Sequence, residues 1–278
     1  RTAVPDTALF RYAESAAGPA IVGDDTIARA KGELLDALPE EGTAILNGDD
    51  ARVMAQAPRA RGRVWTFGLS EGVDVRGVDV EERGCTVSFS VEGDGRYELP
   101  TAGRHNVLNA LAAVAVGAVY GIGPVDAAAG VASFEPSPLR MAVVEAGELF
   151  ILNDAYNCNP GSLRTSLATL AALAEGRTTV AVLGDMLELG DVSAEAHRAA
   201  GREAAGLGID LLFLFGREVA ALREGAIEEG MDPGSVRVFE DRGALARALK
   251  AELAGPAVVL VKGSRDMRME EVVELLIS

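Results

Sequence analysis

The sequence contains little that marks an extracellular, zinc-binding or membrane-spanning protein. Among its 278 residues there are two cysteines, Cys85 and Cys158, and their wide separation fits neither a disulfide framework nor the short spacing of a zinc site. The longest apolar stretch, residues 110–122, is shorter than the about 20 residues that a bilayer span needs. No signal peptide is recognisable. These absences favour a cytoplasmic protein.

Positive charge is also scarce. Lys and Arg total 26 against 42 Asp and Glu, which gives a formal net charge of −16. This balance argues against nucleic acid or an anionic membrane as a general partner. An anionic substrate must therefore be bound by a local pocket of basic side chains or amides, and we expect most of the acidic residues to lie on solvated helix faces.

The sequence lacks the motifs that define two other classes of α/β protein, the dinucleotide-binding oxidoreductases and the phosphate-accepting receiver domains. No Gly-x-Gly-x-x-Gly follows a predicted strand, as a dinucleotide-binding oxidoreductase requires. A signalling receiver domain over residues 143–278 would need a phosphate-accepting aspartate after its third strand, and Gly216 and Arg217 stand there.

The most informative stretch that is present is LFILNDAYNCNPGSLRTS, residues 149–166. Its apolar run at 149–152 indicates a buried strand, and Leu163, Leu167 and Leu170 recur at helical spacing. The turn between them is rich in hydrogen-bonding side chains. Ligands bind outside the carboxyl ends of parallel strands, so this turn is well placed to contact one. The alternative is an ordinary turn in which Ser162 caps the helix.

The pattern predicts an α/β protein with two domains. Pro136 and Pro138 mark a hinge, because two prolines stiffen a linker and cannot lie inside a helix, and we place the domains at 1–139 and 140–278. Beyond the hinge, strands and helices alternate, which indicates a doubly wound, mostly parallel, Rossmann-like sheet. The predicted elements are a helix at 24–38, a strand at 43–46, a small β region at 63–99, a helix at 106–120, strands at 149–153, 178–183, 210–215, 235–239 and 257–261, and helices at 162–174, 193–206, 217–229, 242–253 and 267–277.

Three groups of polar side chains stand out within these elements. Lys31 lies on the apolar face of its helix, where it must either extend to the edge or have a special task. Asn106 and Asn109 are three residues apart, so their amides share a helix face and can match the N6 and N7 edge of adenine, unless Asn106 is the helix N-cap. Lys262 and Arg265 follow the last predicted strand and suit a phosphate or carboxylate, although surface cations are common.

These segments together resemble the Mur ligase family. The likeness is carried by ARAKGELLDALPEEGTAILNGDD, GRHNVLNALAA, SPLR followed by LNDAYNCNPGSL, VLGDMLELG with the following His197, and LVKGSRDMRMEEVV. They occur in the family's order, from about residue 24 to the end. The resemblance implies a partial central, ATPase-type domain over residues 1–139 and the family's carboxyl-terminal domain over residues 140–278.

Within the family the likeness is to ligases that add D-Ala-D-Ala to UDP-N-acetylmuramoyl-tripeptide in peptidoglycan precursor synthesis. The resemblance implies that ATP, with Mg²⁺, converts the tripeptide carboxylate to an acyl phosphate, which the dipeptide amine then attacks. Such catalysis is mostly positioning and charge stabilisation. We therefore expect both substrates as partners, no nucleic acid and no membrane span, and a monomeric chain.

The resemblance also implies roles for individual residues. Lys31 matches a lysine whose carbamate helps to hold Mg²⁺, and burial would favour the neutral amine that carbamoylation needs. Arg140 lies just past the hinge, which suits a group delivered by domain closure. The implied catalytic residues are Lys31, Arg140 and Lys262; the nucleotide-binding residues are Asn106, Asn109, Arg140 and Asp154; and the substrate-binding residues are Tyr156, Asn157, Asn159, Ser264 and Arg265.

Two features of the family are missing from the sequence. No Gly-Lys-Thr loop is present to cradle the ATP phosphates, and Ala17 and Pro19 stand where a His-x-Glu precedes the lysine in the family. The chain also begins with Arg1 and not with Met. We therefore expect a truncated, frame-shifted or diverged chain that is inactive or impaired as a ligase by itself. The alternative is a non-catalytic protein, derived from a Mur ligase, that binds nucleotide or dipeptide.

Overall fold

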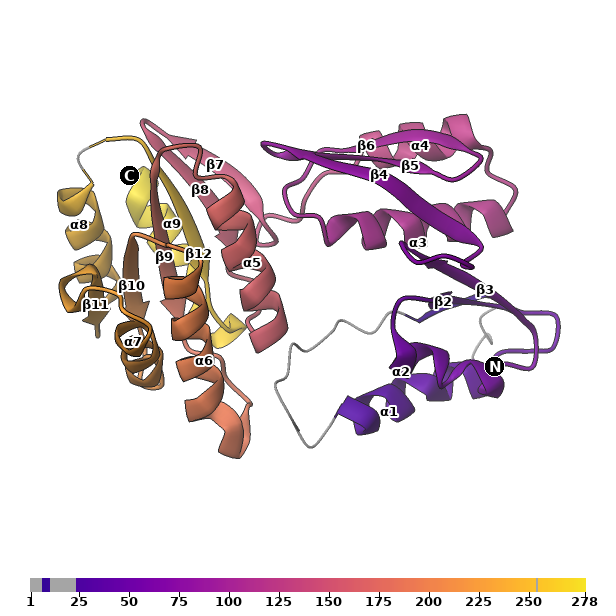
Figure 1. Cartoon of the computed structure of the whole chain (residues 1–278), viewed down its shortest axis with the longest axis horizontal. Helices are drawn as coiled ribbons and strands as arrows, with labels where there is room; N and C mark the ends of the chain where they lie inside the picture. Colours follow the sequence, from indigo (N-terminus) through magenta and orange to yellow (C-terminus); the bar gives the residue numbers. More distant parts are fainter. Residues whose placement is uncertain (1–6, 11–23, 254) are drawn as a thin grey trace. The chain divides into compact units, whose positions relative to one another are not determined.

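The structure is a computed structural model that describes residues 7–10, 24–253 and 255–278 (Figure 1). The described chain divides into two compact units between Glu135 and Pro136. Each unit contains its own six-stranded sheet. Most strand pairs in both sheets are parallel, so the predicted α/β class is confirmed. No helix in the described ranges is both long and apolar enough to cross a membrane.

The first unit combines a parallel and an antiparallel part in one sheet. Its elements are β1 (Thr7–Phe10), α1 (Asp24–Asp36), β2 (Thr43–Asn47), α2 (Ala51–Met54), η1 (Ala57–Arg59), β3 (Arg63–Gly68), β4 (Val75–Arg83), β5 (Thr86–Val91), β6 (Gly95–Leu99), α3 (Asn106–Val119) and α4 (Pro124–Ala132). The strand order is β1 to β6, with β1 to β4 parallel and β4 to β6 antiparallel. The last hairpin turns at Gly93 and Gly95, and both have the positive φ that only glycine adopts easily.

Helix α3 forms the core of the first unit with the sheet. Its apolar side, with Val107, Leu111 and Val114, packs in one cluster with Phe67 and Phe89 of the strands. Small residues between these positions let the helix approach the sheet closely. The predicted helix from residue 106 is therefore confirmed, and its first turn holds both candidate asparagines.

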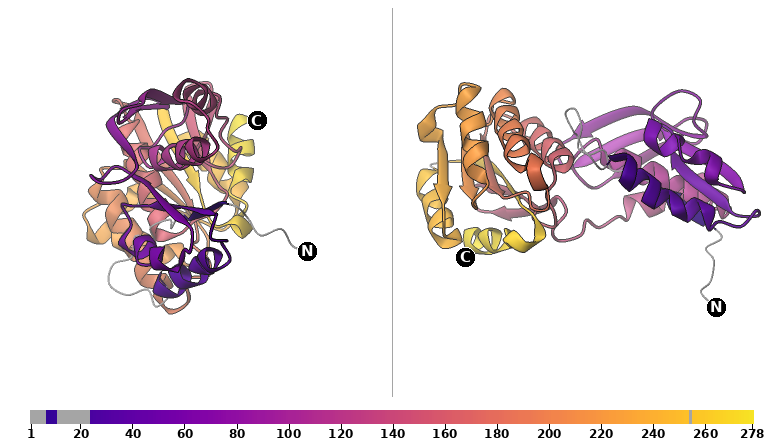
Figure 2. Two further views of the ribbon diagram at one scale, coloured as in Figure 1. Left: turned by 90° about the vertical axis from the view of Figure 1, so that its right-hand side faces the viewer. Right: turned by 90° about the horizontal axis from the view of Figure 1, so that it is seen from below.

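The second unit is a sheet in the order β11-β10-β9-β12-β8-β7, in which only the edge pair β7–β8 is antiparallel. Its core cluster joins alternate strand residues such as Ile151, Val182 and Val259 to helices α8 and α9, and α5 and α7 contact the strands as well. Helices thus lie on both faces of the sheet, as the views in Figures 1 and 2 show. The elements are β7 (Ala142–Ala146), β8 (Leu149–Asp154), α5 (Pro160–Ala172), β9 (Thr178–Gly184), η2 (Gly190–Val192), α6 (Ser193–Gly206), β10 (Leu211–Phe215), α7 (Val219–Glu228), η3 (Pro233–Ser235), β11 (Val236–Phe239), α8 (Arg242–Glu252), β12 (Ala257–Lys262), η4 (Arg265–Met267) and α9 (Glu270–Ile277).

Every strand and helix predicted beyond the hinge is present, with ends shifted by a few residues. Four strands and α-helices were not predicted from the sequence: the strands β1 and β7 and the helices α2 and α4. Strand β7 is a half-exposed edge strand that pairs with β8, and α4 is short and rich in Ala and Gly. Both have weak periodicity, so their order depends on contacts with the rest of their unit.

Candidate functional site

Two of the predicted residues meet at the carboxyl edge of the second sheet. Asp154 ends β8 and Lys262 ends β12, and these parallel neighbours pair Lys262 with Asp154 in register. Lys262 Nζ donates to Asp154 Oδ2 at 2.5 Å, and the lysine side chain is 2% exposed. A buried ion pair is stable only when its remaining hydrogen bonds are also made.

The surrounding groups supply those hydrogen bonds. Lys262 Nζ also donates to the backbone oxygen of Asn157 at 2.9 Å. Asp154 Oδ2 accepts from Ser166 Oγ at 2.7 Å, and Asp154 Oδ1 accepts from the backbone amide of Met141 at 3.2 Å. Ser166 was not predicted from the sequence. Its only signal is its place one helical turn after Ser162 on the same face of α5.

Ser264 joins three loops at this edge. Its Oγ accepts from the amide of Leu187 at 2.8 Å and donates to the backbone oxygen of Cys158 at 3.4 Å. Its own amide donates to the backbone oxygen of Asp185 at 3.1 Å. Burial raises the pKa of the Cys158 thiol to about 12, so this thiol stays protonated at neutral pH and is no nucleophile. Ser264, predicted to bind substrate, is itself buried and bonded to the scaffold.

The loop after β9 is held in the same way. The Asp185 carboxylate accepts from the amides of Arg217, Glu218 and Val219 at 2.9, 3.0 and 3.1 Å, which satisfies donors at the start of α7. The fully buried His197 accepts from the amide of Met186 through Nε2 at 3.0 Å. Its Nδ1 lies 2.8 Å from the backbone oxygen of Ser193, so Nδ1 carries the proton of a neutral imidazole.

The polar residues of the turn after β8 have two different roles: some cap helix α5, and others are exposed. Asn159 is the N-cap of α5: its Oδ1 accepts from the Ser162 amide at 2.8 Å, and its own amide donates to Ser162 Oγ at 3.1 Å. The capping alternative is thus correct for this turn, but with Asn159 as the cap and Ser162 as its reciprocal partner. Asn157 is exposed, and its Oδ1 accepts from the Cys158 amide.

Two cations at this edge are exposed. The guanidinium of Arg140 lies 3.9 Å from the ring centroid of Tyr156, and Tyr156 is 45% exposed. Arg265 pairs with Glu270, with 2.6 Å between Arg265 Nη1 and Glu270 Oε1. Planar guanidinium groups at an exposed edge suit phosphate or carboxylate, so the predicted ligand roles of Arg140 and Arg265 stay open as predictions.

The first unit holds the predicted amides on α3. Asn109 Nδ2 donates to Asn106 Oδ1 at 2.9 Å, and Asn106 Nδ2 donates to the backbone oxygen of Ala102 at 2.8 Å. The expected shared face is therefore present. The N-cap alternative for Asn106 is wrong, because His105 occupies that position. A pocket of about 400 Å³, lined mainly by apolar and small side chains of α3 and α4, adjoins both amides.

The expectation that Lys31 is buried is wrong, because its side chain is exposed. Within residues 28–38 of this segment, the buried residues are Ala28, Gly32, Leu35 and Leu38. A Cβ at Gly32 would meet the Arg59 side chain, so α1 turns this face toward η1. Leu34, an apolar residue of the same helix, is 50% exposed. Burial therefore cannot favour a neutral amine at Lys31.

The residues that would hold Mg²⁺ do not form a complete site in the described chain. No group of three or more His, Cys, Asp or Glu side chains that could hold a metal ion occurs within residues 7–10, 24–253 and 255–278. Ala17 and Pro19, at the positions of the family's His-x-Glu, lie outside these ranges. No step of the chemistry is assigned to Mg²⁺ from these residues.

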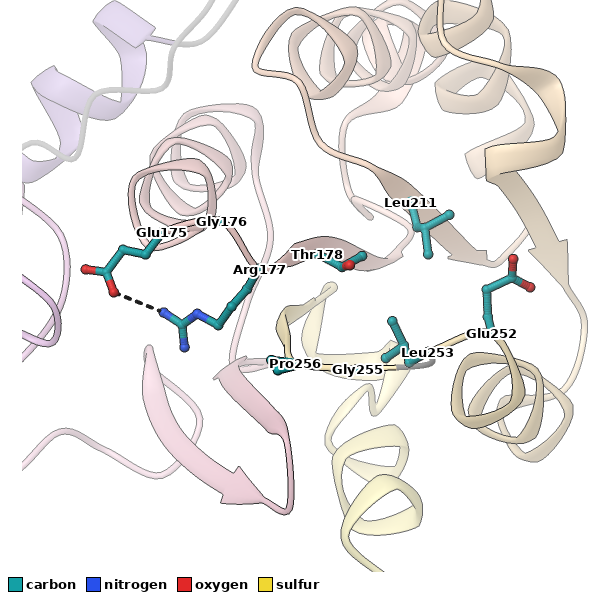
Figure 3. Close-up of a pocket in the computed structure, with 9 residues that line it drawn as sticks. All are labelled: Glu175, Gly176, Arg177, Thr178, Leu211, Glu252, Leu253, Gly255 and Pro256. Carbon is teal, nitrogen blue, oxygen red and sulfur yellow. Dashed lines mark ion pairs between the residues drawn. The ribbon is translucent and has the colours of Figure 1, made fainter.

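A separate pocket of about 530 Å³ lies at the amino ends of β9, β10 and β12, opposite the carboxyl edge of the same sheet (Figure 3). Its one cation, Arg177, donates to the backbone oxygen of Leu173 at 2.8 Å and pairs with Glu175 at 3.6 Å. None of the predicted site residues lines it. The carboxyl edge therefore remains the candidate site of the second unit.

The carboxyl-edge network involves the same segments that carry the resemblance, and comparison with known proteins agrees. The Mur ligase middle domain matches residues 23–117, and the domain described as "Mur ligase, glutamate ligase domain" matches residues 139–265. The chain belongs to the Mur ligase family. The Mur ligase resemblance read from the sequence is thus confirmed, and the buried Asp154–Lys262 pair lies in the second of the two matched domains.

Several Mur ligases resemble the whole chain. The UDP-N-acetylmuramoyl-tripeptide--D-alanyl-D-alanine ligase of Bacillus subtilis (strain 168) is 31% identical over 279 residues, covering 100% of this chain and 60% of the relative. The ligase of the same name from Escherichia coli (strain K12) is 34% identical over 258 residues, covering 90% of this chain and 55% of the relative. The chain spans less than two thirds of the length of these relatives.

Solved structures of Mur ligases have the same fold. A crystal structure of MurF from Acinetobacter baumannii has a TM-score of 0.86 at 28% identity, covering 99% of this chain and 60% of that one. MurF ligase from Thermotoga maritima, solved in complex with ADP, has a TM-score of 0.80 at 26% identity, covering 98% of this chain and 61% of that one.

Proposed function

We propose that this chain is part of an ATP-dependent ligase that adds D-Ala-D-Ala to UDP-N-acetylmuramoyl-tripeptide through an acyl phosphate. The observation that carries the proposal is the match, over the whole chain, to a Bacillus subtilis ligase named for that reaction. The product would serve peptidoglycan precursor synthesis. We also propose a cytoplasmic location, since two widely spaced cysteines fit a reducing compartment.

In this proposal residues 1–139 contribute the adenine-binding amides and residues 140–278 the groups for phosphate and substrate. The Asn106 and Asn109 amides adjoin a mainly apolar pocket, which suits a purine ring with a hydrogen-bonding edge. The ADP in the Thermotoga maritima MurF structure supports a nucleotide as ligand of the family. Exposed Arg140 would receive phosphate oxygens.

The second unit would divide its residues between contact and support. Tyr156, Asn157 and Arg265 are exposed enough to contact the nucleotide or the dipeptide. Lys262, Asp154 and Ser264 are buried and bonded to protein groups. We assign these three to holding the carboxyl-edge loops in a fixed arrangement, because catalysis by positioning depends on such support.

We propose further that these 278 residues do not complete the reaction by themselves. The sequence contains no Gly-Lys-Thr loop for the ATP phosphates, and the described residues form no metal site. The test is phosphate release from ATP by the purified chain with muramoyl tripeptide and D-Ala-D-Ala present. We expect no release above a control that lacks both substrates. Release that depends on both substrates would contradict this part of the proposal.

A non-catalytic binding protein is the second candidate, favoured by the hydrogen bonds that hold Asp154, Lys262 and Ser264 to other protein groups. Titration calorimetry with ADP and, separately, with D-Ala-D-Ala tests it. Binding of either ligand without turnover supports this candidate. Asn109→Ala should weaken the binding of ADP and leave that of the dipeptide unchanged, which separates the two ligand sites.

A further inference from the structure

The turn that carries Arg140 is fixed to the segment after β8 by backbone contacts on both sides. The Arg140 amide donates to the backbone oxygen of Ser137 at 2.9 Å, which closes the turn. The Tyr156 amide donates to the backbone oxygen of Leu139 at 3.0 Å. On the other side of Arg140, the Met141 amide donates to Asp154 Oδ1 at 3.2 Å. Arg140 therefore lies between two points of attachment to residues 154–156.

Met141 shows that this arrangement is imposed by its surroundings. Its φ is +53°, a left-handed conformation that an L residue other than glycine rarely adopts, and its side chain is buried. Such a conformation persists only where neighbouring contacts offset its strain. The bond to Asp154 and the burial of the side chain are those contacts, so the direction of the chain at Arg140 is determined.

The Arg140 side chain is directed in turn by Tyr156. Its guanidinium carbon lies 3.9 Å from the ring centroid, a cation–π distance. No ion pair between Arg140 and a carboxylate occurs in the described ranges, and the residue is exposed. A guanidinium held against a ring keeps its donor edge available to an anion and loses less freedom when the anion binds.

We propose that Asp154 and Tyr156 act as positioning residues for Arg140, and that Ser166 acts through Asp154. Tyr156 orients the guanidinium, and Asp154 fixes the backbone at Met141. Ser166 and Lys262 both bond to Asp154 Oδ2 and thereby leave Oδ1 directed at the Met141 amide. The anion that Arg140 receives rests on the proposed function, in which it is a nucleotide phosphate; the positioning itself does not depend on it.

The direct test is NMR of the arginine side chains in the 278-residue chain labelled with ¹³C and ¹⁵N arginine. Arg140 resonances are identified by their loss in Arg140→Lys. Because the ring current of Tyr156 acts on a stacked guanidinium, we expect upfield-shifted Arg140 δ and ε protons in the wild type and in Tyr156→Phe. The shift should be lost in Tyr156→Ala. Random-coil shifts in the wild type, or unchanged shifts in Tyr156→Ala, overturn the role of Tyr156.

Ser166→Ala tests the second step in the same experiment. Removing its donor to Asp154 should reduce the Arg140 shift without abolishing it, and should speed hydrogen exchange at the Met141 amide. Ser166→Thr keeps a hydroxyl and should restore both values. Unchanged exchange at Met141 in Ser166→Ala overturns the part assigned to Ser166.

A binding measurement connects the arrangement to function. By calorimetry with ADP we expect Tyr156→Ala to weaken affinity about two- to fivefold, the effect of one exposed cation–π contact, and Tyr156→Phe to leave it unchanged. Tyr120→Ala, in the first unit, is the matched control and should bind ADP as the wild type does. Equal affinity in Tyr156→Ala and wild type contradicts a role in presenting Arg140 to phosphate. If the wild-type chain does not bind ADP, the proposed function fails, while the NMR result still decides the positioning.

Discussion

Each unit contains an ion pair between an aspartate and a cation, and the two pairs differ in burial. In the first unit Arg59 of η1 binds Asp36 at the end of α1, and the Asp36 side chain is 54% exposed. In the second unit Lys262 binds Asp154 across neighbouring strands, and the lysine side chain is 2% exposed. Water screens the first pair, whereas the second depends on protein groups for all its hydrogen bonds.

The candidate ligand residues differ between the units in the same way. Asn109 in the first unit is exposed and bonds to its neighbour Asn106. Asp154, Lys262 and Ser264 in the second unit are buried and join separate loops. A substitution in the first unit should therefore report on ligand binding, whereas one in the second should change stability as well. Activity measurements on the second unit need a stability measurement beside them.

Lys262→Met should have the largest effect. It leaves the Asp154 carboxylate buried without its cation, and we expect the free energy of unfolding to fall by about 3–5 kcal/mol. Urea denaturation followed by circular dichroism measures this. Lys250→Met, at an exposed position on α8, is the control and should stay within about 0.5 kcal/mol of the wild type. A loss below about 1 kcal/mol for Lys262→Met would mean that the buried pair contributes as little to the free energy of unfolding as an exposed pair does.

Ser264→Ala should have the next largest effect. It removes the acceptor of the Leu187 amide, and leaving such a group without a partner costs about 1–3 kcal/mol. Hydrogen exchange at Leu187 should quicken in parallel. Ser70→Ala, at an exposed position in the first unit, should change neither the unfolding free energy nor exchange at Leu187. If Ser264→Ala loses stability without faster exchange at Leu187, the lost stability does not come from the hydrogen bond between Ser264 and the Leu187 amide.

The sequence was most informative where a signal is local. Alternation of apolar runs and helical spacing is enough to find β8 to β12 and α5 to α9. The shared face of Asn106 and Asn109 also follows from spacing alone. Strand β7 was not predicted, because its ladder with β8 is what stabilises it. Helix α4 is short and rich in Ala and Gly, so its polar and apolar period is weak.

The candidate site was less predictable because its bonds join distant residues. Ser264 meets Leu187 across 77 positions, and Lys262 meets Asp154 across 108. No spacing rule reveals such partners, so side chains expected to contact ligand also serve the scaffold. Lys31 shows the reverse error: helical spacing placed it on the buried face, but the close approach of η1 at Gly32 determines which face is covered.

Asp36→Asn tests the exposed pair and should have a small, pH-dependent effect. The hydrogen bond from Arg59 lowers the pKa of Asp36 below its ordinary value. A lowered pKa contributes stability above the ordinary pKa of the carboxyl group, and this contribution is lost as the pH falls through the lowered value. Asp36→Asn should therefore melt slightly below the wild type at neutral pH and equally in strong acid. A difference that persists in acid would exclude ionisation of Asp36 as its cause.

Asn109→Ala should have the smallest effect on stability and yet a clear effect on the binding of ADP. Alanine favours a helix more than asparagine does, so we expect the unfolding free energy to stay within about 0.5 kcal/mol of the wild type. If this amide pairs with adenine, its loss should weaken the affinity for ADP, measured by calorimetry, about three- to tenfold, which corresponds to the net free energy of one hydrogen bond. Asn109→Asp keeps an acceptor but removes the donor, so it should also bind ADP weakly. Unchanged ADP affinity in both variants would contradict the ligand role of Asn109 and leave it only as a hydrogen-bond partner of Asn106. A loss of stability comparable to that of Ser264→Ala would show instead that the Asn106–Asn109 pair supports the fold, as the buried network of the second unit does.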